Sequence, residues 1–232
     1  MRHDSFPLML FAAGFGTRMG ALTATRPKPL IAVNGVALLD RALALAEAAG
    51  ATPVVVNTHY LGRQIETHLA GRGVAISDEA EEILETGGGL RKALPLLGQG
   101  PVMTLNPDAV WSGPNPLHLL AQGWDPERMD ALLLVKPAAQ VRGRGAKADF
   151  TVDAEGRIRR AEGAEGVLYL GAQIVKTDAL ADISERVFSL NLIWNRMIAA
   201  GRAYALSYPG DWCDVGSPQG LAEAEAMLGP AA

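Results

Sequence analysis

Short, continuously apolar runs alternate with longer segments of helical periodicity through the first half of the sequence. The apolar runs predict buried strands at residues 7–11, 53–56, 74–77 and 101–105. Apolar positions at helical spacing predict helices at residues 36–49, 60–70 and 88–97. Strands that are apolar on both faces and alternate with helices are typical of a parallel sheet with helices on both sides. We therefore expect a three-layer α/β/α fold with a mostly parallel central sheet.

The second half is less regular, but it carries clear boundary signals. Strands are predicted at residues 131–135 and 167–175, a hairpin at 150–158 and a helix at 188–200. Helix starts are predicted where a polar residue precedes proline, at Asn115-Pro116 and at Ser217-Pro218, the second helix running through Leu228. No linker separates the halves, so residues 1–232 are expected to form a single domain.

Composition and charge exclude several classes of protein. Hydrophobic residues make up 49% and charged residues 20% of the chain, which is typical of a folded domain and not of a disordered one. The net charge of -4 and the lack of a long basic run argue against nucleic acid as a partner. The N-terminal apolar run is too short to span a bilayer, and the single Cys213 excludes an intrachain disulfide. We expect a cytoplasmic protein with no membrane partner.

The first predicted strand continues into a loop of small residues, Ala12-Ala13-Gly14-Phe15-Gly16-Thr17-Arg18. Such a loop lets backbone N–H groups approach an anion closely. A P-loop would end in Gly-Lys-Ser/Thr, which this loop does not. A dinucleotide-binding loop would have a third glycine in place of Met19 and an acidic residue in place of Asn57. The loop is better interpreted as a phosphate-binding loop of a third kind, in which Arg18 binds phosphate oxygens.

A lysine between two prolines follows, in Pro27-Lys28-Pro29-Leu30. The prolines are expected to hold Lys28 in an extended, stiff segment. Together with Leu22-Thr23, the two motifs resemble those of the sugar-1-phosphate nucleotidyltransferases, and the resemblance extends along nearly the whole chain. Members of that family join a sugar 1-phosphate to a nucleoside triphosphate and release pyrophosphate. The resemblance implies their Rossmann-like fold, here without the C-terminal β-helix that some relatives append.

The resemblance also implies catalytic, metal and nucleotide sites. Arg18, Lys28 and Asp108 correspond to catalytic residues, and Asp108 and Asp214 to the aspartates that hold Mg²⁺ with phosphates and waters. Pro107 stands where the family usually has glycine, which could alter the turn before Asp108. The implied nucleotide-binding residues, in a half of about residues 1–110, are Ala12, Ala13, Gly14, Phe15, Gly16, Thr17, Arg18, Glu85, Thr86, Gly87, Gly88 and Asn106.

For the sugar, the resemblance implies Glu162 near the hydroxyl groups and Gly171 close to the ring, in a half of about residues 111–232. Some relatives carry a lysine after that glutamate that touches the sugar phosphate, but Gly163 stands there in this chain. Either Lys28 binds that phosphate alone, or Arg144 or Lys147 takes the place of the missing lysine.

The implied substrates and their alternatives follow from the same resemblance. UTP with N-acetylmuramic acid 1-phosphate is the favoured pair, and GTP with mannose 1-phosphate is the main alternative. A non-catalytic regulator that binds sugar nucleotides is the alternative of another class. We expect a monomer or a small homo-oligomer. A phosphate monoester is already mostly ionised at neutral pH, so the reaction needs positioning and charge stabilisation and no general base.

Overall fold

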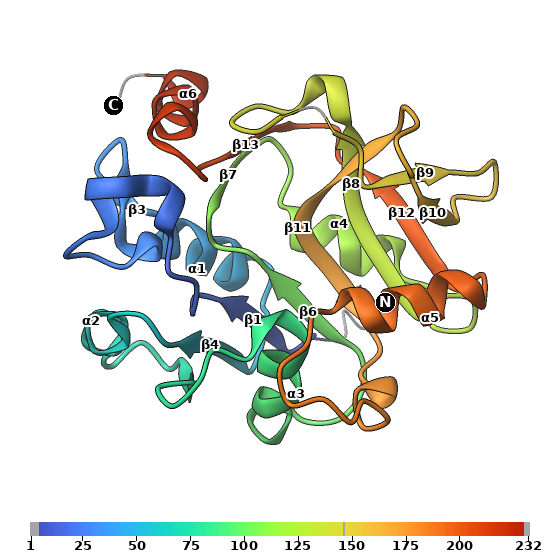
Figure 1. Ribbon diagram of the computed structural model, residues 1–232, viewed down its shortest axis with the longest axis horizontal. Coiled ribbons are helices and arrows are strands. Elements are labelled where there is room, and N and C mark those ends of the chain that lie inside the picture. Colours follow the sequence, from blue (N-terminus) through green and yellow to red (C-terminus); the bar gives the residue numbers. More distant parts are fainter. Residues whose placement is uncertain (1–4, 146, 230–232) are drawn as a thin grey trace.

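The computed structural model describes residues 5–145 and 147–229. Among these residues, the main sheet has nine strands in the order β10-β9-β11-β6-β1-β4-β5, with β8 beside β11 and β12 beside β8 (Figure 1). The strands are β1 (Leu8–Phe11), β4 (Val54–Thr58), β5 (Ala75–Asp78), β6 (Val102–Leu105), β8 (Ala131–Pro137), β9 (Phe150–Val152), β10 (Ile158–Arg160), β11 (Val167–Val175) and β12 (Ala203–Ser207). Two short ribbons accompany the sheet, formed by β2 (Ala32–Val33) with β3 (Val36–Ala37) and by β7 (Ala109–Ser112) with β13 (Asp211–Asp214).

The parallel strands expected from the sequence are present in the first half. Strand β1 is parallel to β4 and β6, and β4 is parallel to β5. The second half joins this sheet through β11, which is antiparallel to both β6 and β8, while β12 is again parallel to β8. The α/β class and the mostly parallel sheet are confirmed.

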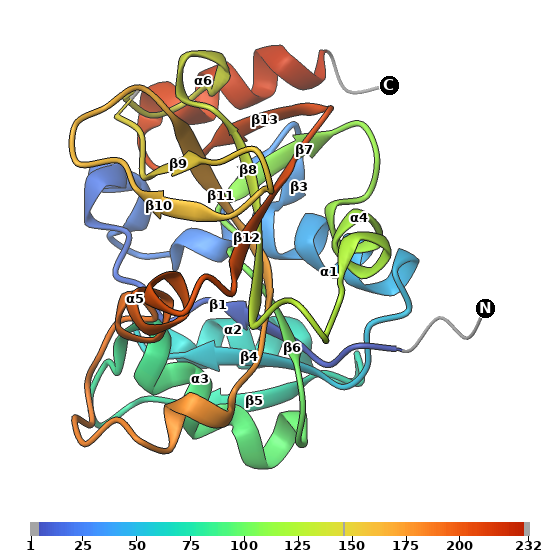
Figure 2. The same ribbon diagram turned by 90° about the vertical axis from the view of Figure 1, so that its right-hand side faces the viewer.

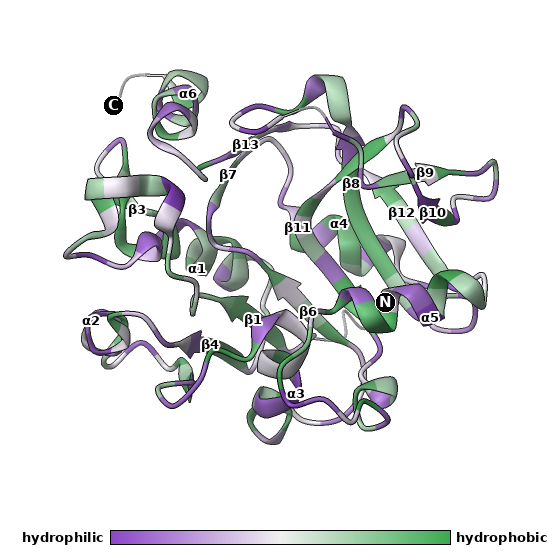
Figure 3. Cartoon of the chain, viewed as in Figure 1, coloured by the Kyte–Doolittle hydropathy of each residue, from purple (hydrophilic) through white to green (hydrophobic). Residues whose placement is uncertain are grey.

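Helices cover both faces of the sheet (Figures 1 and 2). Leu8 and Leu10 of β1 share a buried cluster with residues of α1 (Leu38–Ala48), α2 (Gly62–Leu69) and α4 (Pro116–Gly123). Met9 points to the other face, in a cluster with α3 (Glu85–Leu97) and α5 (Asn191–Ala199). Successive strand residues point to opposite faces, so a strand buried on both sides must be apolar throughout. Figure 3 shows this as hydrophobic strands inside more hydrophilic loops.

Several predicted boundaries are confirmed by their hydrogen bonds. The Asn115 side chain accepts the N–H of Leu117 at 2.9 Å, and Ser217 Oγ accepts that of Gly220 at 3.1 Å, which opens α6 (Pro218–Leu228). Strand β11 has the predicted bounds. The expectation for Lys28 is wrong: Pro27 is extended, but Lys28–Leu30 forms a 3-10 turn in which the Leu30 N–H donates to the Pro27 carbonyl.

Other elements begin or end differently from the prediction, or were not predicted. Helix α3 begins at Glu85, before the three glycines, and α5 begins only at Asn191. The segment Thr17–Thr23 is a 3-10 helix with a kink at Gly20, and β7, β12 and β13 have no counterpart among the predicted strands. The division into a nucleotide-binding and a sugar-binding half stays a prediction. No helix in the described part of the chain is both long and apolar enough to cross a bilayer.

Candidate active site

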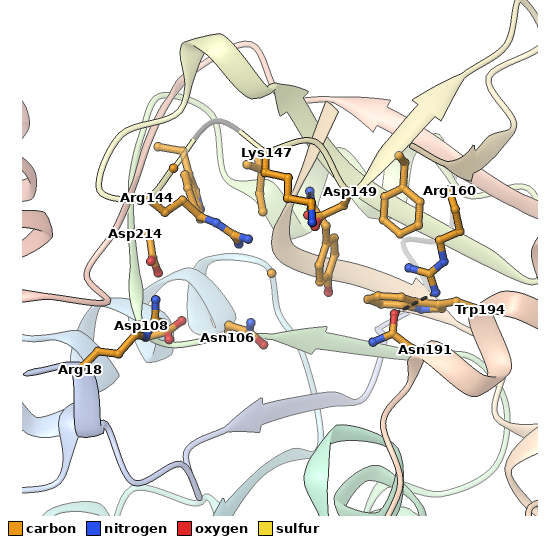
Figure 4. Close-up of a pocket in the computed structure, with 16 residues that line it drawn as sticks. Arg18, Asn106, Asp108, Arg144, Lys147, Asp149, Arg160, Asn191, Trp194 and Asp214 are labelled. Carbon is orange, nitrogen blue, oxygen red and sulfur yellow. Dashed lines mark hydrogen bonds between the residues drawn. The ribbon is translucent and has the colours of Figure 1, made fainter. Parts of the chain in front are cut away.

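Three hollows meet where β1 and β6 end at their carboxyl edge, which is the usual place for ligands in an open α/β sheet. The main cavity, about 560 Å³, extends between β11, β13 and α5 (Figure 4). The loop cavity, about 190 Å³, lies against the glycine loop, and the β5-side cavity, about 210 Å³, lies beside Asn57 and Glu79. Asp108 lines all three, so this carboxylate marks their junction.

The glycine loop is held in place by a buried series of hydrogen bonds between polar groups. Asn57 Oδ1 accepts the N–H of Ala12 at 2.7 Å, and Asn57 Nδ2 donates to Glu79 Oε1 at 2.7 Å. Glu79 Oε2 accepts the N–H of Leu84 at 2.9 Å, which links the loop to the start of α3. Gly89 is required here, because a Cβ at that position would lie 2.7 Å from Glu79 Oε1. Sequence reasoning missed Glu79, and only its position after a strand could have indicated it.

The far side of the loop wraps around Lys28. Gly16 has φ 65°, a conformation that favours glycine, and a Cβ there would lie 3.0 Å from Lys28 Cβ. Thr23 Oγ1 donates to the Gly16 carbonyl at 3.0 Å and is buried, which explains a threonine at this position in the motif. Gly14, Gly16, Thr17 and Arg18 line the loop cavity together with Lys28, whereas the half-exposed Phe15 packs edge-on against His59.

Lys28 and Asp108 form the central contact of the site. Lys28 Nζ donates to Asp108 Oδ2 at 2.6 Å, and Lys28 is only 8% exposed. The two residues are 80 positions apart and come from different elements, so the sheet brings them together. The Asp108 carboxylate therefore holds the buried ammonium group at the cavity junction and offsets part of the cost of burying it.

Asp214 lies next to Asp108 through the ribbon of β7 and β13. Asp214 pairs with Ala109, and the N–H of Val215 donates to the Asp108 carbonyl at 2.9 Å. Burial raises the pKa of the Asp214 carboxyl, and the charge of Asp108 raises it further. Arg18 and Lys28 oppose this rise, and Figure 4 shows Arg18, Asp108 and Asp214 gathered at one end of the main cavity.

These two carboxylates suit a metal ion that substrate and water help to hold. Within residues 5–145 and 147–229, no three His, Cys, Asp or Glu side chains gather closely enough to hold a metal by themselves. Mg²⁺ is commonly held by one or two carboxylates, with substrate phosphates and waters completing its coordination. Asp108 and Asp214 suit that arrangement, since a cation between them would relieve the repulsion that adds to the effect of burial on the pKa of Asp214.

The residues from Glu85 to Gly88 have two different roles, lining a cavity and packing. Glu85 and Thr86 line the β5-side cavity, and Glu85 adopts φ 58°, an unusual conformation for a non-glycine residue at a pocket. Gly87 and Gly88 instead donate their N–H groups to the Phe188 carbonyl at 2.9 and 3.0 Å. A Cβ on Gly87 would lie 2.4 Å from the Phe188 ring, so the packing leaves no room for a side chain at this position. A direct contact of either glycine with a base stays a prediction.

Some of the residues expected around the sugar line the main cavity, and one does not. Gly171 lines the main cavity and receives the N–H of Asn106 on its carbonyl at 2.8 Å; a Cβ there would lie 2.9 Å from Asn106 Cβ. Arg144 and Lys147 also line the cavity, and their loop is anchored where the Arg142 carbonyl accepts the N–H of Asp214. Glu162, at the exposed turn after β10, is not among the lining residues.

The main cavity contains three polar side chains that sequence reasoning missed: Asp149, Arg160 and Asn191. Asp149 Oδ2 accepts the N–H of Tyr169 at 3.0 Å. Arg160, at the end of β10, lies over the Phe150 ring, and Asn191 lies on α5 (Figure 4). The hairpin of β9 and β10 was predicted, but nothing in its sequence indicates that it faces a cavity.

Replacing Gly216 with alanine should lower kcat by about tenfold without unfolding the protein. The added Cβ would lie 2.5 Å from Asp214 Oδ2 and 3.0 Å from Arg18 Nη2, so both charged groups must move. Both atoms are ends of flexible side chains, and the melting temperature should change little. Steady-state kinetics and a thermal melt test this together; an unchanged kcat would show that the positions of Asp214 and Arg18 are not critical.

The loop, the lysine and the two aspartates lie together, as expected for a nucleotidyltransferase. The family model of the MobA-like NTP transferase domain matches residues 8–177, and the chain belongs to that family. The chain is 39% identical to the N-acetylmuramate alpha-1-phosphate uridylyltransferase of Caulobacter vibrioides, over 96% of this chain and 97% of that protein. It is 32% identical to the enzyme of the same name from Neisseria meningitidis, over 95% and 97%.

A solved structure shares the fold. A UDP-glucose pyrophosphorylase in complex with UDP-glucose superposes with a TM-score of 0.78 at 17% identity, over 97% of this chain and 98% of that chain. The predicted family and the predicted enzyme class are therefore confirmed: the chain is a sugar-phosphate nucleotidyltransferase.

Proposed function

We propose that the enzyme joins UTP to N-acetylmuramic acid 1-phosphate, giving the UDP-sugar and pyrophosphate. The names and full-length coverage of the two relatives support this pair. The observation that carries the chemistry is the position of Asp108, which lines three cavities and binds Lys28 at 2.6 Å. A triphosphate, a base and a sugar phosphate need three adjoining spaces that share one charged centre, and this arrangement supplies them.

The nucleotide is assigned to the two smaller cavities. Backbone N–H groups from Gly14 to Thr17 would cradle the triphosphate in the loop cavity, and Arg18 would neutralise the leaving pyrophosphate. The base and ribose would lie in the β5-side cavity, which Glu85, Thr86 and Asn106 line. The buried pair of Asn57 and Glu79 holds the two walls of this space together.

The reaction follows from the position of the charges. A phosphate oxygen of the sugar 1-phosphate attacks the α-phosphorus of UTP, the bond to the β-phosphate oxygen breaks, and pyrophosphate leaves with that electron pair. No proton must be removed, because the attacking monoester is already ionised. Lys28 would lie between the attacking phosphate and the α-phosphate and lower their repulsion.

Asp108 and Asp214 would hold Mg²⁺, which would withdraw charge from the α-phosphate when bound. The sugar would occupy the main cavity against Gly171, with Arg144 or Lys147 beside its phosphate. A direct role of Glu162 stays a prediction, since the side chain is exposed outside the cavity lining. A monomer or small homo-oligomer also stays a prediction.

The test is pyrophosphate release with Mg²⁺, in which UTP, GTP, dTTP and CTP are each combined with N-acetylmuramic acid, mannose and glucose 1-phosphates. The proposal expects the highest kcat/KM for UTP with the muramic acid derivative, and no release after chelation of the metal. Preferential use of GTP with mannose 1-phosphate would replace the proposed pair by its main alternative. Binding of nucleotide without release from any pair would contradict the proposed transfer.

A further inference from the structure

Arg160 brings a guanidinium group into the main cavity at the end away from Asp108, where neutral partners hold it (Figure 4). Its Nε and Nη2 atoms donate to Asn195 Oδ1 at 3.0 and 2.8 Å, and Nη2 also donates to Asn191 Oδ1 at 2.8 Å. The group also lies 4.9 Å from the centroid of the Phe150 ring and 5.9 Å from that of Trp194. Two amides and two rings therefore fix its plane without neutralising its charge.

The charge of Arg160 has no carboxylate partner in the described part of the chain. No Asp or Glu there lies within ion-pair distance of it, and its Nη1 atom has no acceptor among residues 5–145 and 147–229. Asp149 lies in the same cavity and attracts this charge from beyond ion-pair distance, while its Oδ2 atom accepts the Tyr169 N–H. A guanidinium group offers five N–H donors in one plane, so the donors on Nη1 remain for a ligand.

The lining of the main cavity favours an anionic ligand beyond the phosphate. The cations Arg18, Arg144, Lys147 and Arg160 face the carboxylates Asp108, Asp149 and Asp214, an excess of one positive charge. Arg18 and the two aspartates of the metal pair lie at the reaction end, and Arg160 lies at the other end (Figure 4). A sugar whose phosphate is at Asp108 would extend its ring substituents toward Arg160.

We propose that Arg160 binds a carboxylate on a ring substituent of the sugar, and so selects an acidic sugar 1-phosphate over a neutral one. This rests on the proposed function. N-acetylmuramic acid differs from N-acetylglucosamine by an ether-linked lactyl group that ends in a carboxylate, the planar anion that guanidinium groups bind best. Asn191 and Asn195 are positioning residues that hold Arg160 in place.

The experiment compares N-acetylmuramic acid 1-phosphate, its lactyl carboxamide and N-acetylglucosamine 1-phosphate, each with UTP, in wild type and Arg160→Gln. Loss of a charge-assisted hydrogen bond predicts that Arg160→Gln lowers kcat/KM for the acidic sugar by about 10- to 100-fold, mainly through KM. With the wild-type enzyme, kcat/KM for the carboxamide should be lower than that for the acidic sugar by a similar factor. Arg160→Gln should lower kcat/KM for the carboxamide little further. In Arg160→Gln, kcat/KM for the neutral sugar should change by no more than about threefold, because this sugar offers Arg160 no anion.

Matched variants separate recognition from folding. Arg159→Gln removes the same charge from the adjacent, exposed position of β10 and should retain the acidic preference. Arg160→Lys keeps a cation and should restore part of the preference. Equal losses for all three sugars in Arg160→Gln would overturn the inference and leave the proposed function standing. If the wild-type enzyme turned over neutral sugars and not the acidic one, both the substrate pair and the inference would be overturned. The transferase chemistry would remain.

Discussion

Replacing Asp108 with asparagine is expected to lower kcat for pyrophosphate release by about 100-fold or more. Asparagine keeps the shape of the side chain and an oxygen that can accept from Lys28 Nζ, now 2.6 Å from Asp108 Oδ2. It loses the negative charge that would hold Mg²⁺ at the junction of the three cavities. The loss should therefore fall on the chemical step, and nucleotide binding measured without metal should persist.

The matched control for this variant is Asp211→Asn. Asp211 begins β13, is exposed, and lies outside the three cavities, so it loses the same charge without touching the site. Its kcat should stay within about twofold of wild type, as expected for a surface substitution. A kcat for Asp108→Asn close to that of wild type, at saturating Mg²⁺, would remove Asp108 from the reaction.

Replacing Lys28 with methionine is expected to lower kcat by about 100-fold, with a smaller rise in KM for both substrates. Methionine fills the space of the lysine stem against Gly16 but removes the ammonium group between the attacking phosphate and the α-phosphate. Lys28 is only 8% exposed, so water cannot readily take its place. The side chain of its partner Asp108 is 32% exposed, which limits the cost of leaving that carboxylate unpaired.

The double variant of Lys28→Met with Asp108→Asn tests whether the two residues act as one unit. Groups in direct contact are not additive, so the double variant should lose much less than the product of the two single losses. Independent losses would instead multiply, which would mean that the 2.6 Å contact has no part in catalysis. A thermal melt of each variant shows whether lost activity reflects unfolding.

The sequence predicted the half of the fold in which local signals are strong. Strand β1 is followed by small residues and glycines, and the helix starts at Asn115 and Ser217 carry their own capping side chains. The family resemblance carried by the motifs was sufficient to single out Arg18, Lys28, Asp108 and Asp214. The fold places all four around one junction.

What the sequence could not predict depends on contacts between distant segments. Asp214 reaches Asp108 only because β13 pairs with β7, and neither short strand has a periodic pattern of its own. Arg160 enters the main cavity because the hairpin of β9 and β10 packs against β11 and α5, and an arginine at a hairpin end is usually solvent-exposed. Glu79 becomes part of the loop support through Asn57, 22 positions earlier.

Lys28 shows the limit of a local rule. Prolines on both sides restrict the backbone, and they predicted an extended segment. The turn Lys28–Leu30 forms instead because its carbonyls receive N–H groups, with Ile31 donating to Lys28 at 3.0 Å, and because the ion pair with Asp108 fixes the side chain. The expected stiffness of the segment agrees with this fixed ion pair, although the backbone conformation is a turn and not an extended segment.

The most direct test of the account follows the phosphorus atoms of UTP. The enzyme is incubated with Mg²⁺, N-acetylmuramic acid 1-phosphate and UTP labelled either at the α- or at the γ-phosphorus. Attack on the α-phosphorus predicts that the α-label appears in the UDP-sugar and the γ-label in pyrophosphate. Release of the α-label as free UMP, or of the γ-label as inorganic phosphate, would mean hydrolysis in place of transfer and would contradict the account.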